Sequence, residues 1–222
     1  LAVRPDHWDG GIGSLLLEPV LDAFSRWGVT QAGLFTFPDS PKHLGLYQKH
    51  GFWPGALTAM TARDVAPSRS DPLLLSTTDA DLAPLCESLL PGLDLTSELD
   101  AVAAQGIGDT VLVRRDDEVA AFAVCHVGPG SEADEGDCFV KFGAARTGDE
   151  TTFADLLAAC DAFASQRGAT RLVAGVSTAR LPAYRAMIGA GFRTFLLGVA
   201  MHTRPDGPHL DTPAHLVIDD LR

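Results

Sequence analysis

The chain has 222 residues, of which 46% are hydrophobic and 21% are charged, and its formal net charge is −12. This composition is that of a globular protein, and the length allows one large domain or two small domains with a core each. No apolar run approaches the roughly 18 residues that a membrane helix needs. The negative charge argues against general attraction to nucleic acid or to an anionic membrane. We therefore expect no nucleic-acid and no membrane partner, and an anionic ligand must be held by local geometry.

The cysteines give no sign of a metal or redox site. Cys86, Cys125, Cys138 and Cys160 lie far apart, without a C-x-x-C pair. We expect buried thiols in a reducing compartment and place the protein in the cytoplasm. The opening segment Leu1-Ala2-Val3 is too short for a signal peptide, and we interpret it as the tail of a strand whose upstream partners are missing.

Helical spacing dominates the first fifty residues. An amphipathic helix is predicted over residues 12–27 and ends at Gly28. Its apolar face is expected to contain Ile12, Leu15, Leu16, Val20, Ala23, Phe24 and Trp27. A buried strand is predicted over 32–37. Ser40 and Pro41 then form the N-cap and first position of a helix that runs to His50 and ends at Gly51.

A polar, proline-containing stretch over residues 64–72 predicts a domain boundary, which gives domains 1–66 and 67–222. Residues 53–63, before it, are expected to form a strand pair. The elements predicted after it are strand 73–75, helix 80–90, a hairpin of 110–114 and 119–127 turned at Asp116-Asp117, strand 138–144, helix 151–167, strand 171–176, helix 181–190 and strand 194–201.

An acidic loop lies between the predicted hairpin and the next strand. It contains Glu132, Asp134, Glu135 and Asp137. These carboxylates have neither a framing histidine nor the spacing of a calcium-binding loop. We expect a solvated turn and no metal site.

The two halves of the sequence repeat each other at an offset of 140 residues. Gly28 corresponds to Gly168, and Gly51-Phe52 corresponds to Gly191-Phe192. The helix faces also correspond, with Leu16 on Leu156, Val20 on Cys160 and Ala23 on Phe163. We predict a tandem of one strand, helix, strand, helix, strand unit, so that differences between the copies are informative about function.

A glycine-rich turn, residues 5–13, precedes the first helix. Glycines remove Cβ atoms, so that consecutive backbone N–H groups can close around an anion. The helix N-terminus adds roughly half a positive charge. The turn can therefore hold a pyrophosphate in a protein of negative net charge.

This turn and a later segment together resemble a known family. Val3-Arg4-Pro5 through Gly11-Ile12-Gly13 looks like the acetyl-CoA motif of the GNAT acetyltransferases, and Leu46-Tyr47-Gln48-Lys49-His50-Gly51-Phe52 looks like their second motif. The resemblance covers residues 1–63. It implies an α+β (α/β) fold of two tandem GNAT-like mixed-sheet units, the first incomplete at its N-terminus and the second degenerate.

The resemblance also implies a site for acetyl-CoA, used as a co-substrate. Backbone groups of Ala2 and Val3 would line the pantetheine arm, and Ser40 stands where the family often has an asparagine that contacts it. Ser40 is equally well explained as a helix cap. The pyrophosphate would be held by the backbone amides of Trp8, Asp9, Gly10, Gly11, Ile12, Gly13 and Ser14. Trp8 replaces the arginine or glutamine usual in the family, which affects side-chain contacts to phosphate but not amide contacts.

Tyr47 stands where the family has its general acid, and a phenol with a pKa of about 10 suits a thiolate leaving group. His43 and His50 lie on the same predicted helix, but each is more typical of a surface or capping residue, so no base is named. The second copy serves as a control. Gly10, Gly11, Gly13 and Tyr47 correspond to Glu150, Thr151, Phe153 and Met187, which cannot form the cradle or donate the proton.

We therefore predict an acetyl-CoA-dependent N-acyltransferase whose first half is active. A non-catalytic acyl-CoA sensor or interaction protein is the alternative. A Rossmann-type dinucleotide site is disfavoured, because Gly11-Ile12-Gly13 lacks the third glycine of G-x-G-x-x-G. The acceptor can be a small amine, an amino acid, an antibiotic or a peptide N-terminus, and the acidic surface favours a cationic one. The sequence carries no signal for an oligomeric state.

Overall fold

The computed structural model describes residues 2–68, 70–77, 80–204, 206–207 and 212–220. The fold is mixed α/β and divides into two compact units. Unit 1 contains the described residues of Leu1–Gly55 and Gly198–Gly207, and unit 2 those of Ala56–Leu197 and Pro208–Asp220. These bounds differ from 1–66 and 67–222. The predicted boundary between the two copies of the repeat stays a prediction.

Unit 1 is built from two helices and a short strand. Its elements are the 3-10 helix η1 (Pro5–His7), α1 (Ile12–Arg26), β1 (Gly33–Thr36) and α2 (Pro41–Lys49). Strand β2 (Trp53–Asp64) begins in this unit, and strand β8 (Arg193–His202) ends in it. The helices and strand predicted in this region are confirmed. Residues 2–4, however, form no strand, and Leu1 lies outside the described residues.

Unit 2 holds most of the strands of the sheet. Its further elements are β3 (Leu73–Leu74), the 3-10 helix η2 (Leu75–Thr77), α3 (Ala83–Leu89), α4 (Thr96–Gln105), β4 (Gly108–Arg115), β5 (Glu118–Val127), β6 (Asp137–Ala145), α5 (Glu150–Gln166), β7 (Arg171–Ser177), α6 (Leu181–Gly189) and β9 (Leu216–Asp219). The strands run in the order β7-β6-β5-β4-β3. Only β6 and β7 are parallel within that order, and β9 pairs antiparallel with β6.

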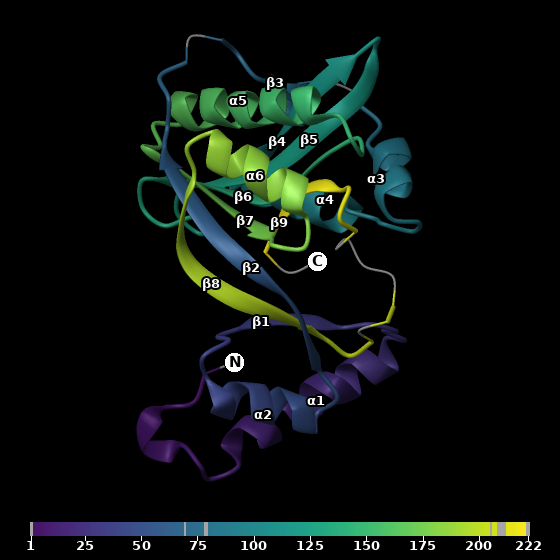
Figure 1. The fold of residues 1–222 in the computed structure, drawn as a ribbon, viewed down its shortest axis with the longest axis vertical. Coiled ribbons are helices and arrows are strands. Elements are labelled where there is room, and N and C mark those ends of the chain that lie inside the picture. The colour runs from purple at the N-terminus through teal and green to yellow at the C-terminus, as the bar shows by residue number, and fades with distance from the viewer. Residues whose placement is uncertain (1, 69, 78–79, 205, 208–211, 221–222) are drawn as a thin grey trace. The chain divides into compact units, whose positions relative to one another are not determined.

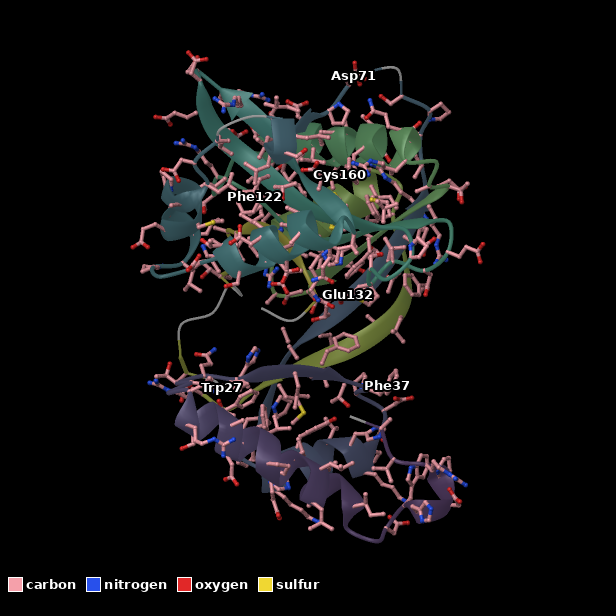
Figure 2. All side chains as sticks on the ribbon, turned by 180° about the vertical axis from the view of Figure 1, so that it is seen from behind. Trp27, Phe37, Asp71, Phe122, Glu132 and Cys160 are labelled. Carbon is pink, nitrogen blue, oxygen red and sulfur yellow. The ribbon has the colours of Figure 1, made fainter. Side chains whose placement is uncertain are left out.

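Two apolar cores cover the two faces of this sheet. Along β5, Ala121, Ala123 and Cys125 face α5 and α6, whereas Phe122 and Val124 face α3 and α4. This alternation is the two-residue period of a strand that is buried on both faces. In Figure 1, α5 and α6 lie side by side on one of these faces, and Figure 2 labels Phe122 and Cys160, one from each core.

The structure differs from the predicted elements at several points. Residues 53–64 form one strand, not a strand pair. The hairpin of β4 and β5 turns at Asp116 and Asp117 as predicted, with φ of 49° and 67°. Helix α4 and strand β9 were not predicted. No helix among the described residues is long and apolar enough to cross a membrane.

The offset of 140 residues also relates the elements of the two copies. Helices α1 and α2 correspond to α5 and α6, and strands β1 and β2 correspond to β7 and β8. The turns agree as well. Gly28 and Gly168 have φ of 69° and 73°, and in each the N–H donates to the serine carbonyl three residues earlier, at 3.1 Å.

In each copy, the strand between the two helices pairs with the strand that follows the second helix of the other copy. In unit 1, β1 pairs antiparallel with β8, with Gly33 opposite His202. In unit 2, β7 pairs antiparallel with β2, with Val173 opposite Ala62. Adding 140 to 33 and to 62 gives 173 and 202, so the two pairings have the same register. We call this arrangement the strand exchange.

Two close contacts hold the exchanged strands in place. A Cβ at Gly198 would lie 1.9 Å from Cζ of Phe35, so only glycine leaves room for that ring on β8. In unit 2, Arg63 of β2 donates to Asp161 Oδ2 at 2.6 Å and to the Ala190 carbonyl at 2.7 Å. Burial raises the pKa of Asp161, and the neighbouring Arg63 opposes that rise. Removing Arg63 would leave a carboxylate buried without its cation.

The predicted apolar face of α1 is wrong in part. Leu16 and Val20 are each 40% exposed, whereas Leu17 is the buried residue of this helix, and Leu21 packs on Phe52 and Met201. Trp27, after the end of α1, is 74% exposed (Figure 2). On α5, the counterparts of Leu16 and Val20, which are Leu156 and Cys160, are fully buried, because α5 packs on β4, β5 and β6. The apolar residues of α1 therefore have the same spacing as those of α5, but they are less buried.

Candidate functional site

A cavity of about 720 Å³ lies in unit 1, between η1, the start of α1 and one face of α2. That volume is within the range of small-molecule sites, roughly 300–1,000 Å³. The predicted site residues line it, with the single exception of Gly10. They are Ala2, Val3, Trp8, Asp9, Gly11, Ile12, Gly13, Ser14, Ser40 and Tyr47.

The N-terminus of α1 opens into this cavity. Gly11 caps the helix with φ of 77° and supplies no side-chain acceptor, and the first intrahelical bond runs from Leu15 N–H to Gly11 O at 3.2 Å. Within the described part of the chain, no group accepts a hydrogen bond from the backbone N–H groups of residues 9–14. An added Cβ would meet nothing within 4 Å at Gly11 and only His7 O, at 3.6 Å, at Gly10. The N-terminus therefore offers an open row of donors with the positive end of the helix dipole behind it.

Trp8 is already engaged within the protein. Its backbone N–H donates to Pro5 O at 3.2 Å, and its indole N–H donates to Val3 O at 2.8 Å. A pyrophosphate contact from the Trp8 amide would have to replace the first of these bonds. The second bond ties the carbonyl of a residue predicted to line the pantetheine arm to the turn that follows it.

Two lysines of the cavity wall were missed in the sequence. Lys42 and Lys49 both line the cavity. Lys42 Nζ lies 2.8 Å from Asp9 Oδ2 and 5.7 Å from the centre of the Trp8 ring. This exposed pair is worth little and can open. The sequence could have indicated this, because Lys42 and Lys49 are seven residues apart and therefore lie on the same face of the helix as Leu46.

Gly13 has a packing role in addition to its backbone role. A Cβ at residue 13 would lie 2.9 Å from Cδ2 of Leu46, so α1 approaches α2 closely at this point. The predicted cradle explanation is therefore incomplete for Gly13. A large side chain there would disturb helix packing as well as ligand binding, and Ser14 is the better position for a test.

Tyr47 lies on α2 with its side chain half-buried. Its ring meets Phe52 edge-on at 6.3 Å, and it packs on the small core of unit 1. Burial raises the pKa of its phenol above the ordinary value of 10.0. Tyr47 therefore keeps its proton throughout the neutral range and can act as a proton donor.

Ser40, His43 and His50 lie on α2 or at its ends. Ser40 accepts a hydrogen bond from His43 N–H at 3.5 Å, so the helix-cap role is present, and its contact to pantetheine stays a prediction. His43 lines the cavity, one helical turn from Tyr47, whereas His50 does not line it.

The second copy closes the corresponding helix end with its own carboxylate. Asp149 caps α5 and accepts from Thr152 N–H at 2.9 Å, which lowers the pKa of Asp149. Phe153 and Met187, at the positions of Gly13 and Tyr47, are fully buried in the core. Tyr184 packs on the same core, with Oη 3.4 Å from Thr194 Oγ1. At the start of α5, therefore, the Thr152 N–H has an acceptor within the protein, whereas none of the N–H groups of residues 9–14 has one among the described residues.

The acidic loop forms ion pairs. Asp137 accepts two bonds from Arg171, at 2.9 and 2.6 Å, and Glu132 lies 2.8 Å from Lys141 Nζ. In the part of the chain that the structure describes, no group of three or more His, Cys, Asp or Glu side chains is arranged to hold a metal. All four cysteines are buried free thiols.

Comparison with known proteins identifies the fold. The profile of the Acetyltransferase (GNAT) family matches residues 1–52. A proposed acetyltransferase from Pyrococcus horikoshii is similar over 100% of this chain and 68% of its own, with 15% identity and a TM-score of 0.68. The sequence match to the GNAT family is confined to residues 1–52, and the chain as a whole has the GNAT fold.

Two further structures agree. A GCN5-related N-acetyltransferase from Sphaerobacter thermophilus matches with 16% identity and a TM-score of 0.59, over 95% of this chain and 73% of its own. A tandem GNAT protein from the clavulanic acid biosynthesis pathway matches with 13% identity and a TM-score of 0.55, over 91% and 72%. No curated protein matches the sequence. The GNAT fold rules out the Rossmann-type alternative.

Proposed function

We propose that this protein transfers an acetyl group from acetyl-CoA to an amine, with acetyl-CoA bound in the first half of the sequence. The observation that carries the proposal is the open row of N–H groups of residues 9–14 at the start of α1. A diphosphate needs several convergent donors, and a helix N-terminus supplies them together with a favourable dipole. Lys42 and Lys49 of α2 add positive charge to the lining of the same cavity.

The residues present fit acetyl-CoA at three further points. Gly10 and Gly11 leave space for an anion to approach the backbone. Ala2 and Val3 border the cavity at the place proposed for the pantetheine arm, and Tyr47 borders it from α2. Trp8 and Asp9 complete the wall beside the helix end.

The chemistry requires one nucleophile and one proton donor. The neutral amine nitrogen attacks the thioester carbonyl carbon, so that a C–N bond forms and the C–S bond breaks. Tyr47 Oη donates its proton to the departing thiolate sulfur. The nitrogen loses one proton to water, and the Tyr47 phenolate regains one from water. A phenol is protonated at neutral pH, and burial raises the pKa of Tyr47 further above that range.

The second half supplies no such site in this proposal. It is a degenerate copy in a tandem protein with the boundary near residue 66, and its contribution is the strand β8 that pairs with β1. The acceptor is a small-molecule or peptide amine, and the net charge of −12 favours a cationic acceptor over nucleic acid or an anionic membrane. The buried free thiols favour a cytoplasmic location.

Replacing Tyr47 by phenylalanine tests the chemistry separately from binding. Phe keeps the ring that packs on Phe52 but has no proton to donate. We expect kcat to fall about 100-fold, the lower range for loss of a general acid, and the Kd of acetyl-CoA to stay within about twofold. Thiol release with a panel of amines measures the rate, and calorimetry measures the binding.

Tyr184→Phe is the matched control, since Tyr184 packs in the other half, and it should leave both values unchanged. A protein that binds acetyl-CoA but transfers acetyl to none of the amines, with or without Tyr47, would be an acyl-CoA sensor. That outcome would contradict the proposed activity. An unchanged rate in Tyr47→Phe would remove Tyr47 as the donor.

A further inference from the structure

Three positions of the first copy have been assigned to the pantetheine arm, and each has a counterpart in the second copy. Ala2, Val3 and Ser40 correspond to Phe142, Gly143 and Arg180 at the offset of 140. What these counterparts contact shows how the same place is filled in unit 2.

The backbones of Phe142 and Gly143 are paired with the strand β9. Strand β6 pairs with β7 along Asp137–Val140 and with β9 along Phe142–Ala145. Phe142 lies opposite Asp219, and Gly143 lies opposite Ile218. In the first copy the counterparts Ala2 and Val3 form no strand. The edge proposed to face the pantetheine arm in one copy is therefore covered by a strand in the other.

Arg180, the counterpart of Ser40, reaches the same strand. Its Nη1 donates to Val217 O at 3.1 Å, and its Nη2 donates to Asp219 Oδ2 at 3.0 Å. Both side chains of the ion pair are 1% exposed. A buried pair with this geometry holds its partners in one arrangement, because separating them would leave two charges without compensation.

No room remains around β9. Leu216, Val217 and Ile218 are fully or almost fully buried. On the neighbouring strand β7, a Cβ at Gly175 would lie 2.9 Å from Cα of Asp220, so the backbones approach as closely as glycine allows. A pantetheine arm could enter here only by displacing β9.

We propose that β9 occupies, in the second half, the place that the pantetheine arm takes in the first half. The chain then has a single acyl-CoA site, and its second half is closed by its own strand, which Arg180 and Asp219 fasten. This inference rests on the proposed function, because Ala2 and Val3 are assigned there to the pantetheine arm, and Ser40 is the position that the family resemblance predicts to contact it.

Hydrogen exchange and calorimetry on the full chain test the inference. The probe is acetyl-CoA, and Ser14→Glu serves as the variant whose first site is blocked by charge. We expect one equivalent of acetyl-CoA to bind the parent, and Ser14→Glu to bind it at least about 30-fold more weakly. The amides of 216–219 should exchange at least about 100-fold more slowly than unprotected amides, and saturating acetyl-CoA should change them less than about twofold in either protein.

A second equivalent in the parent, or faster exchange of β9 when acetyl-CoA is added to Ser14→Glu, would overturn the inference. Absence of binding in the parent would instead overturn the proposed function, while slow exchange of β9 would still support closure of the second half. The two failures are therefore distinguishable.

A double variant tests the fastening ion pair. Arg180→Ser with Asp219→Ser removes both charges together, so no buried charge is left without a partner. Exchange at 216–219 should become at least about tenfold faster, while exchange in β5 stays the same. Equal protection of β9 in this variant and in the parent would show that the ion pair does not hold the strand.

Discussion

Ser14→Glu is expected to weaken acetyl-CoA binding at least about 30-fold without destabilising the protein. Ser14 lines the cavity, and its amide belongs to the open row at the start of α1. A carboxylate there would face the diphosphate. Two charges about 4 Å apart near a protein surface repel by about 4 kcal/mol at an effective dielectric constant of 20, so even partial screening leaves a large loss.

The same change should leave the helix intact or improve it. Residue 14 lies in the first turn of α1, where a negative side chain interacts favourably with the helix dipole. Calorimetry with acetyl-CoA measures the loss of affinity, and thermal unfolding measures stability. Ser14→Gln, which has the same length and no charge, should bind within about fivefold of the parent, since it lacks the repulsion. Equal binding by parent and Ser14→Glu would place the diphosphate elsewhere.

Cutting the chain at the predicted domain boundary should unfold both pieces. In fragment 1–66, β1 has no β8 to pair with, and the small core around Phe52 loses Val199 and Met201. In fragment 67–222, β7 loses the seven pairs that it makes with Thr58–Asp64, and Asp161 loses Arg63. Leaving that carboxylate unpaired costs about 3–5 kcal/mol, a large share of the roughly 5–15 kcal/mol that stabilises a domain.

Amide dispersion in NMR spectra and cooperative thermal unfolding report on each fragment. Neither fragment should show a native spectrum as a monomer, and mixing or co-expressing them should restore it. The uncut chain is the reference. A fragment 1–66 that folds alone as a monomer would show that folding does not need the strand exchange. Residues 1–66 would then be an independent domain.

Local signals explain what the sequence predicted well. Gly28, Gly51, Gly168 and Gly191 follow helices and have positive φ, and Ser40 begins α2, so α1, α2, α5 and α6 were found close to their bounds. Repetition at a fixed offset then led us to predict a second copy of the unit. The cavity residues followed from the resemblance to the two GNAT motifs, one in the turn before α1 and the other on α2.

Other features depend on partners distant in sequence. β9 has four residues and α4 buries only Val102, so neither has a strong pattern of its own. The strand exchange pairs residues 33 and 202, and nothing local distinguishes it from pairing within one copy. The apolar face of α1 was misassigned because Leu16 and Val20 copy the pattern of α5, whereas Leu17 and Leu21 make the contacts. The Gly13 contact with Leu46 likewise required coordinates.

In our proposal, the backbone N–H groups at the N-terminus of α1 bind the diphosphate of acetyl-CoA. The most direct measurement is an NMR titration of the assigned, ¹⁵N-labelled full chain with acetyl-CoA. The largest shifts should fall on the N–H groups of residues 9–14, with those of 149–154 unchanged. Chemical-shift changes confined to the start of α5, or no change at the start of α1 at saturating acetyl-CoA, would contradict this proposal.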